Sequence, residues 1–349
     1  MEFIYKLENS DIFENYWESY IRSNLSSYKY TLLNLDYMLF YSQKLSQDYS
    51  FVVTENSKPV GICFLPIEEN YGYKTVSLAN GYTMAPLSNN SRVEKKIFQE
   101  IEKIVEKNDI QQIKFYIDPL ISEYGIKFNY LKNYGFLDSS ASDCLLDLIQ
   151  DIKELWKNLR KSYKSLINSI LNSEEFEVVK IDFNNSNYEI HEEYRNLHRL
   201  CAGRETRIKD TFDKQFEMLE QDQASLFGLK HKGKFIGFNY FFHFQKTVVY
   251  ASGADNPEYE NLNLPIYHSI LWSAFLYYKE RGFDFMQFSQ PCGFNEVDGF
   301  DDYLDQKQIN ISHFKRGTGT EMRTLYRGIK YYDKKLLEKD LIEFKKRLL

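Results

Sequence analysis

A lysine near the C-terminal end of the sequence is the first candidate for chemistry. Lys315 follows Phe314 and precedes a turn that contains two glycines. The alternation of residues 308–314 predicts a strand, and residues 322–349 read as a long basic helix. A strand that ends in a turn would place the Lys315 cation at a sheet edge. Neighbouring side chains of a strand point to opposite faces, so Arg316 is the weaker candidate and is kept as a substrate-binding residue.

A second set of polar residues lies on the predicted strand 234–244. Apolar side chains at every second position from Ile236 would cover one face, which leaves Asn239 and His243 on the other. His243 could act as a general base, because imidazole titrates near neutral pH. A histidine in such a place is more often structural, so both interpretations stay open. Asn239 is kept as a substrate-binding candidate.

An arginine in a polar loop forms a third candidate. Arg204 follows Gly203 in a run that a helix precedes and another helix follows. The guanidinium fork suits a carboxylate or a phosphate on a substrate. The alternative is a structural ion pair with Glu205 or Asp210.

The composition limits the classes of protein to consider. A chain of 349 residues suggests two domains, and 43% hydrophobic residues can fill two cores. The net charge of -6 argues against a globally basic nucleic-acid binder, so DNA is not an expected partner. The four cysteines are far apart, without metal-ligand spacing, which favours reduced thiols and no metal. No signal peptide and no apolar run of about 18 residues is visible, so a cytoplasmic protein without a membrane span is expected.

The order of predicted elements repeats once along the chain. The first half has helices at 12–21, 30–45, 93–107 and 120–133, and strands at 51–54, 60–66, 75–79, 113–117 and 144–148. The second half has helices at 152–171, 188–200, 212–220 and 265–281, and strands at 176–181, 225–231, 234–244, 247–252, 283–289 and 308–314.

A repeated fold is the simple explanation of this order. Each half reads helix, helix, strands, helix, strand, which predicts an α/β (α+β) class with two similar domains. Each domain would have a mixed, mostly antiparallel sheet flanked by helices. The boundary is expected near Asp151, giving domains 1–150 and 151–349.

Several short motifs strengthen this interpretation, because they occur in the order that one family shows. The motifs are Lys114–Pro119, Leu131-x-x-x-Gly135-Phe136, Leu145–Leu148 followed by a helix with Arg160, Leu197-His198 and Phe314-Lys315-x-x-x-Gly319. With the order of elements, they resemble the FemAB-like proteins, which have a GNAT acyltransferase fold present twice. The helix at 265–282 also resembles the related acetyltransferase domain of polysaccharide-synthesis proteins.

The resemblance implies roles for residues of the second half. In GNAT folds the acyl donor lies between two diverging strands, which would be 247–252 and 283–289 here. Backbone N–H groups from Tyr250 to Gly253 could then hold the oxyanion. Tyr250 and Asp255 become candidates for catalysis, and Gly253 for substrate binding. The resemblance also implies that Lys315 stabilises negative charge in the leaving group or the intermediate.

Two departures from the family bear on the donor. CoA-dependent GNAT enzymes carry a Gln/Arg-x-x-Gly-x-Gly/Ala loop after the fourth strand, and the loop from Gly253 to Pro257 lacks it. A similar string, Arg316-x-x-Gly319-x-Glu321, has a glutamate in place of the last Gly or Ala and does not follow the fourth strand. Sustained heptads for the coiled-coil arm of FemA-type enzymes are also missing.

The resemblance implies an N-acyltransferase. It would move an acyl group from an activated thioester, acyl-CoA being the expected co-substrate, to the amine of an amino sugar, a nucleotide-linked sugar or another cell-envelope or glycan precursor. An aminoacyl-tRNA-dependent ligase that extends a peptidoglycan peptide is the alternative, so tRNA is a possible but not favoured partner. A non-catalytic module that binds a glycan precursor is the second alternative.

Overall fold

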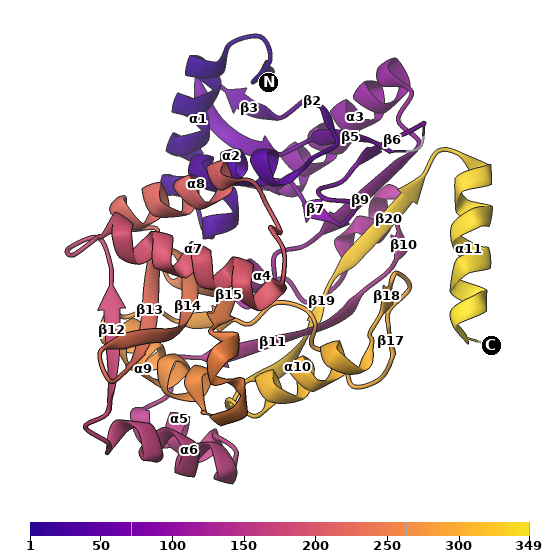
Figure 1. Ribbon diagram of the computed structural model, residues 1–349. Coiled ribbons are helices and arrows are strands. Elements are labelled where there is room, and N and C mark those ends of the chain that lie inside the picture. The colour runs from indigo at the N-terminus through magenta and orange to yellow at the C-terminus, as the bar shows by residue number, and fades with distance from the viewer. Residues whose placement is uncertain (71, 263, 349) are drawn as a thin grey trace. The chain divides into compact units, whose positions relative to one another are not determined.

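The computed structural model describes residues 1–70, 72–262 and 264–348, which divide into two compact units (Figure 1). Unit 1 holds Met1–Ser142, Asn295–Asp305 and the chain from Thr324 onward. Unit 2 holds Asp143–Phe294 and Gln306–Arg323. The predicted class is confirmed, because each unit combines helices with a mixed, mostly antiparallel sheet.

Unit 1 is built on two larger sheets, one in the order β1-β3-β4-β8 and one in the order β10-β20-β9-β6-β5-β2 with β7 beside β9, and β17 and β18 form a separate two-stranded sheet. Its strands are β1 (Glu2–Tyr5), β2 (Leu45–Asp48), β3 (Phe51–Glu55), β4 (Lys58–Cys63), β5 (Pro66–Asn70), β6 (Tyr73–Val76), β7 (Thr83–Met84), β8 (Leu87–Ser88), β9 (Gln112–Tyr116), β10 (Leu137–Asp138), β17 (Val297–Asp298), β18 (Asp302–Tyr303) and β20 (Arg327–Tyr331). Its helices are α1 (Ser10–Ser23), α2 (Leu32–Tyr41), α3 (Ser91–Asn108), α4 (Pro119–Ser122) and α11 (Lys334–Leu348), with 3-10 turns η1 (Tyr28–Tyr30) and η2 (Tyr130–Tyr134).

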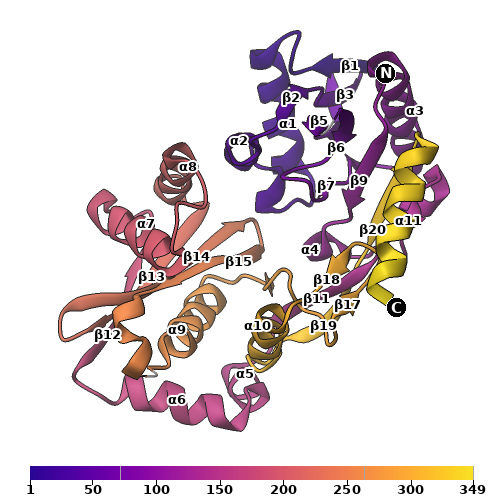
Figure 2. The ribbon, with the colours of Figure 1, turned by 45° about the vertical axis from the view of Figure 1, so that its right-hand side comes forward.

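The long helix α3 shows how the sequence builds this unit. Asn90 caps its first turn by accepting a hydrogen bond from the Val93 N–H at 3.0 Å. Val93, Ile97 and Ile101 are fully buried at spacings of four residues, so one face of the helix packs on the sheet. Helices α1 and α2 lie on the other side of the unit 1 sheets (Figure 2).

Unit 2 has one large sheet in the order β12-β13-β14-β15-β16-β11-β19. Its strands are β11 (Ala141–Asp147), β12 (Phe176–Ile181), β13 (Ala224–His231), β14 (Lys234–Phe244), β15 (Thr247–Asp255), β16 (Phe285–Gln287) and β19 (Glu321–Leu325). Its helices are α5 (Ile152–Asn158), α6 (Lys161–Leu171), α7 (Tyr188–Ala202), α8 (Lys209–Glu220), α9 (Ile266–Glu280) and α10 (Gln306–Arg316), with the 3-10 turn η3 (Pro257–Leu262).

Helices cover both faces of the unit 2 sheet. α7 and α8 lie on one face, and α6 and α9 lie on the other (Figure 1). Apolar side chains of α9 such as Ile270 and Phe275 are buried against Phe241 and Met286 of the sheet. This core fixes the position of β14, β15 and β16, the strands that carry most of the candidate residues.

Two central strands of unit 2 separate after a short parallel contact. β15 and β16 pair over Thr247–Val249 and Phe285–Gln287, and β15 then continues to Asp255. In unit 1 the matching pair, β6 and β9, is also short, but β7 pairs with β9 beyond it. In unit 1, β7 therefore occupies the position beyond the short parallel pair, whereas no described strand occupies the matching position in unit 2.

The C-terminal part of the chain adds one strand to each sheet, β20 in unit 1 and β19 in unit 2. β20 lies between β9 and β10 of unit 1, where its yellow ribbon stands among purple strands (Figure 1). β11 lies between β16 and β19 of unit 2. The expected domain 151–349 therefore differs from the observed unit 2, because the hydrogen bonds of β20 with β9 return the C-terminal segment to unit 1.

Two predicted elements near the C-terminus are wrong. Residues 308–314 form the helix α10 rather than a strand, because the buried positions, Ser312 and Lys315, are three residues apart as on a helix face. The segment 322–349 is not one helix, since β19 and β20 precede α11. Gly328 disfavours a helix at this position, and β9 and β10 provide the backbone hydrogen bonds of a strand instead.

Two other helices are shorter than expected. The helix predicted at 152–171 breaks at Leu159 into α5 and α6, and the helix predicted at 120–133 is replaced by α4 and η2. Gly135 ends η2 in the left-handed conformation with φ +80°, which glycine adopts at low cost. Of the helices that the structure describes, none is long and apolar enough to cross a membrane.

Candidate functional site

Four of the candidates gather where β15 runs beyond its contact with β16. Asn239 of β14 pairs with Gly253 of β15, two residues before Asp255. A Cβ atom at position 253 would lie 2.8 Å from the Tyr250 hydroxyl, 2.8 Å from a ring carbon of Tyr267 and 3.0 Å from Asn239 Oδ1. Only glycine fits this approach without a shift of its neighbours. We call Asn239, Tyr250, Gly253, Asp255 and Tyr267 the Asp255 cluster.

Asn239 contributes a buried donor to this cluster. Its side chain is 0% exposed, and the Tyr250 hydroxyl donates to its Oδ1 at 3.5 Å. Its amide nitrogen Nδ2 has no hydrogen-bond partner among the described residues. Buried polar groups are nearly always hydrogen-bonded, so this donor is suited to an oxygen atom that the protein itself does not supply.

Asp255 gives the cluster an anion. Its Oδ1 accepts hydrogen bonds from the Tyr267 hydroxyl at 2.7 Å and from Cys201 Sγ at 3.1 Å. Burial, together with Tyr250 and Asp255, raises the pKa of Tyr267 far above its usual value, so Tyr267 remains a donor. The partly exposed Asp255 carboxylate can hold an amine or accept its proton.

The sequence did not identify the helix residues of this site. Tyr267 lies on α9 and Cys201 near the end of α7, and their meeting with Asp255 depends on long-range packing. Arg207, in the loop between α7 and α8, is buried, donates to the Tyr194 hydroxyl at 3.2 Å and lies over the Phe212 ring at 4.0 Å.

The exposed Arg204 is not part of this arrangement. It lies in the loop between α7 and α8, and no hydrogen bond or ion pair is recorded for it among the described residues. The structural ion pair with Glu205 or Asp210 is therefore not formed. Its role in binding a substrate stays a prediction.

Lys315 and Arg316 both hold the loop that follows β16. Lys315 Nζ donates to the Ser289 carbonyl at 2.8 Å, and Arg316 donates to the Gly293 carbonyl at 2.6 Å. Because they lie on a helix, they do not point to opposite faces as a strand would require. Burial lowers the pKa of Lys315, which is only 5% exposed. Their assigned roles stay predictions, and the geometry makes both of them anchors of this loop.

Buried polar groups surround the Lys315 ammonium. Asp143 is 0% exposed and accepts hydrogen bonds from the Gln287 side chain and from the Cys144 N–H. Cys292 Sγ donates to the Ser289 carbonyl at 2.8 Å. Asp143 and Gln287 therefore belong to the β16 side of the strand separation, and no local pattern in the sequence pointed to either.

His243 has a different environment from the Asp255 cluster. Its ring nitrogens contact the Tyr278 hydroxyl at 3.1 Å and Asp222 Oδ1 at 3.2 Å, and Arg281 also binds Asp222. His243 pairs with Val248, at the end of β14 where β15 is still paired with β16. Burial lowers its pKa, so the ring is neutral at pH 7 and fully engaged, which fits the structural interpretation.

Across residues 1–70, 72–262 and 264–348, no group of three or more His, Cys, Asp or Glu side chains is placed to hold a metal ion. The site therefore offers hydrogen-bond donors, a carboxylate and a buried ammonium as its chemical groups.

Known structures share the fold of the whole chain. No protein-family model and no curated protein sequence matches it. The structure of FemX superimposes with a TM-score of 0.66 at 12% identity, over 97% of this chain and 99% of that one. The C-terminal domain of a lysylphosphatidylglycerol synthetase from Agrobacterium fabrum gives 0.60 at 10% identity, over 96% of each chain. L-PGS from Bacillus licheniformis gives 0.56 at 13% identity, over 89% of this chain and 91% of that one. The chain therefore has the same fold as FemX, built from two compact units.

Proposed function

We propose that this protein transfers an activated acyl group to an amine, at the place in unit 2 where β15 and β16 separate. The observation that carries the proposal is the buried Asn239 Nδ2 donor, which lies beside Gly253 and lacks a partner among the described residues. The filled separation in unit 1 supports unit 2 as the reacting unit, since β7 pairs with β9 there.

The groups of the Asp255 cluster suit the steps of acyl transfer. The acyl carbonyl oxygen would accept a hydrogen bond from Asn239 Nδ2 and from backbone N–H groups of β15 beyond Val249. The amine attacks the carbonyl carbon and forms the C–N bond, and the bond from carbon to the leaving sulfur or oxygen breaks. Asp255 takes the proton that the amine loses, and the leaving group takes up a proton.

The donor could be an acyl thioester, as the sequence favours, or an aminoacyl ester of tRNA. The segment between β15 and α9 contains η3 and no glycine pair, so the residues present do not fit the diphosphate cradle of CoA-dependent GNAT enzymes. One similar structure is named a lysylphosphatidylglycerol synthetase, a name that specifies an aminoacylated product. These observations keep the aminoacyl donor as the second candidate.

The proposed acceptor is the amine of an amino sugar or another cell-envelope precursor. Asp255 supports an amine-bearing acceptor, because a carboxylate attracts the protonated form before reaction. Polysaccharide biosynthesis and a cytoplasmic location remain part of this proposal.

A two-donor assay tests the proposal. The full chain is incubated with an amino-sugar acceptor and with acetyl-CoA, a longer acyl-CoA or aminoacylated tRNA in parallel. Acceptor-dependent release of thiol, or acceptor-dependent deacylation of tRNA, supports the proposal and identifies the donor. If neither occurs with any donor, acyl transfer is refuted; binding of the acceptor without turnover would then favour the non-catalytic module.

A further inference from the structure

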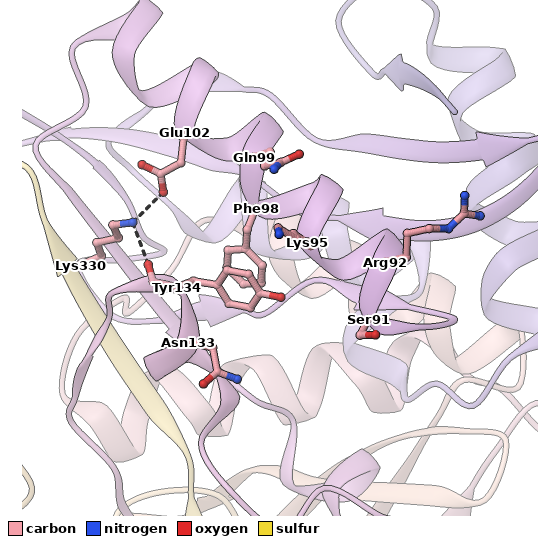
Figure 3. Close-up of a pocket in the computed structure, with 9 residues that line it drawn as sticks. All are labelled: Ser91, Arg92, Lys95, Phe98, Gln99, Glu102, Asn133, Tyr134 and Lys330. Atoms are coloured by element: carbon pink, nitrogen blue, oxygen red, sulfur yellow. Dashed lines mark hydrogen bonds and ion pairs between the residues drawn. The ribbon is translucent and has the colours of Figure 1, made fainter.

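Unit 1 carries a pocket that none of the groups discussed above lines. It has a volume of about 730 Å³, and its lining comes from the outer face of α3, from Asn133 and Tyr134 of η2, and from Lys330 of β20 (Figure 3). Pockets for small molecules in proteins span about 300–1,000 Å³, so this one is large enough for a ligand. Its lining differs in kind from the Asp255 cluster, since most of its side chains are polar or charged and lie at the surface of α3.

A flat aromatic surface forms the floor of this pocket. The rings of Phe98 and Tyr134 stack with centroids 3.7 Å apart and an angle of 10° between their planes. Phe98 is buried and Tyr134 is half-buried, both line the pocket, and their rings overlap in Figure 3. The Tyr134 hydroxyl donates to Glu94 Oε1 at 2.6 Å, and Gly135 with φ +80° ends the turn that carries the ring. The platform is therefore fixed before any ligand binds, and a planar ring could extend the stack.

The charge of the pocket is positive, although the whole chain has a net charge of -6. Three cations, Arg92, Lys95 and Lys330, line it together with a single carboxylate, Glu102. Lys330 binds Glu102 at 2.8 Å, and Arg92 binds Glu55 at 2.8 Å. Lys95 has no hydrogen bond or ion pair among the residues that the structure describes. An uncompensated ammonium beside a flat ring favours an anion that carries an aromatic group.

Side-chain amides stand on both sides of the platform. Gln99 lies above the Tyr134 ring and Asn133 below it in Figure 3. Neither amide has a recorded side-chain hydrogen bond among the described residues. Amides of this kind recognise the edge of a base, since they offer a donor and an acceptor together. Ser91 adds a hydroxyl at the same rim.

We propose that this pocket binds a mononucleotide, with the base stacked on Tyr134 and the phosphate held by Lys95 with help from Arg92. A nucleotide would contact the aromatic ring, the cations and the amides of the pocket together. Inorganic phosphate would contact only the cations, and an uncharged aromatic compound would contact only the Tyr134 ring. A purine is the expected base, since amide side chains match the N6 and N7 atoms of adenine. The inference is independent of the proposed acyl transfer, as it requires binding and no turnover.

Calorimetric titration of the full chain with ADP tests the inference. We expect saturable binding with a Kd below about 1 mM, the upper end of ordinary substrate affinities. Ribose 5-phosphate and inorganic phosphate serve as probes without a base, and both should bind at least about tenfold more weakly because stacking is lost. A short single-stranded oligoadenylate distinguishes a free nucleotide from a nucleotide within RNA.

Matched variants assign the contacts. Lys95→Gln should weaken ADP binding by about five- to tenfold and reduce its salt dependence. The control is Lys107→Gln, an exposed lysine of the same helix outside the pocket, which should leave the Kd unchanged. Tyr134→Leu should weaken binding by about tenfold or more, and a thermal melt checks that this variant is folded.

Four outcomes would overturn the inference. They are the absence of saturable ADP binding, equal affinity for ADP and inorganic phosphate, equal effects of Lys95→Gln and Lys107→Gln, and binding of the oligoadenylate alone. None of them bears on acyl transfer, because the donor assay in unit 2 does not use these side chains. Conversely, an inactive protein that still binds ADP through Lys95 and Tyr134 would refute only the transfer reaction.

Discussion

An alanine at position 253 separates a catalytic role of the Asp255 cluster from a packing role. The new Cβ would lie 2.8 Å from the Tyr250 hydroxyl, whereas ordinary contacts begin at 3.4 Å. The hydroxyl and the Tyr267 ring must therefore each retreat by about 0.6 Å, and Asn239 Oδ1 by somewhat less. Overpacking of this degree costs about 1–3 kcal/mol of unfolding free energy.

The effect on activity should exceed the effect on stability. A displacement of about 1 Å at reacting groups can cost about 100-fold in rate, so Gly253→Ala should lower kcat by about 10- to 100-fold. The assay is steady-state transfer with whichever donor the two-donor experiment identifies, alongside urea unfolding of the same preparation. The KM should change little, because the change acts on the carbonyl oxygen rather than on the rest of the donor.

A second glycine offers a matched control in the other unit. A Cβ at Gly61 would meet Ile97, Val93 and Leu87 at 2.8, 3.0 and 3.1 Å, which are nearly the distances at Gly253. Gly61→Ala should therefore cost a similar free energy of unfolding and leave kcat unchanged. Equal activity of the two variants, with equal loss of stability, would show that Gly253 serves packing alone and would refute the assignment of the reacting site.

Three further substitutions give distinct signatures. Asn239→Leu should abolish transfer while the free energy of unfolding stays within about 1 kcal/mol of the wild type, because it removes a buried donor that lacks a partner among the described residues; a large loss of stability would contradict this. Lys315→Met should lower kcat by about 100-fold if the cation acts on the substrate. If kcat is unchanged and only the free energy of unfolding by urea falls, the role of Lys315 is limited to its hydrogen bond with the Ser289 carbonyl. Burial lowers the pKa of His191 to about 4, so the folded ring stays neutral while the unfolded ring takes up a proton below about pH 6.5. The wild type should thus lose stability as the pH falls from 6.5 toward 4, and His191→Phe should lose about 1 kcal/mol less between pH 6 and 5 in denaturant titrations; identical losses would refute the assignment.

Local patterns predicted most elements of both units. The strands 176–181 and 234–244 agree with β12 and β14 to the residue, and the helix at 188–200 agrees with α7 within two residues. These segments have strong periodicity and polar or glycine boundaries, so short-range preferences and tertiary packing favour the same structure. The repeat of element order then led to the correct fold class.

The failures lie where distant segments decide the structure. Residues 321–331 follow a basic pattern that also suits a helix, but β20 forms its ladder with β9, more than 200 residues earlier in the chain. A single sequence does not reveal which distant strands pair with each other in a sheet. The alternation of Ile309 and Ile311 was too short to define a strand, and the helix α10 buries Ser312 and Lys315 instead.

The candidate site was predictable in part for the same reason. Asn239, Gly253 and Asp255 lie on adjacent antiparallel strands joined by a short turn, so local order brings them together. Tyr267 and Cys201 come from helices on opposite faces of the sheet, and only the packed structure shows that both reach Asp255. His243 looked equivalent to Asn239 because strand alternation fixes the face but not the environment along the strand.

The position of β20 between β9 and β10 has a consequence for folding during synthesis on the ribosome. β9 and β10 of unit 1 are synthesised about 215 and about 190 residues before β20, the strand that pairs with both of them. At about 5–20 residues synthesised per second, β9 and β10 would lack their partner strand β20 for roughly 10–40 s. Unpaired strand edges promote aggregation, so a nascent chain stalled before position 327 should depend on chaperones. Synthesis of β20 would then complete the unit 1 sheet, whose neighbouring strands were made much earlier.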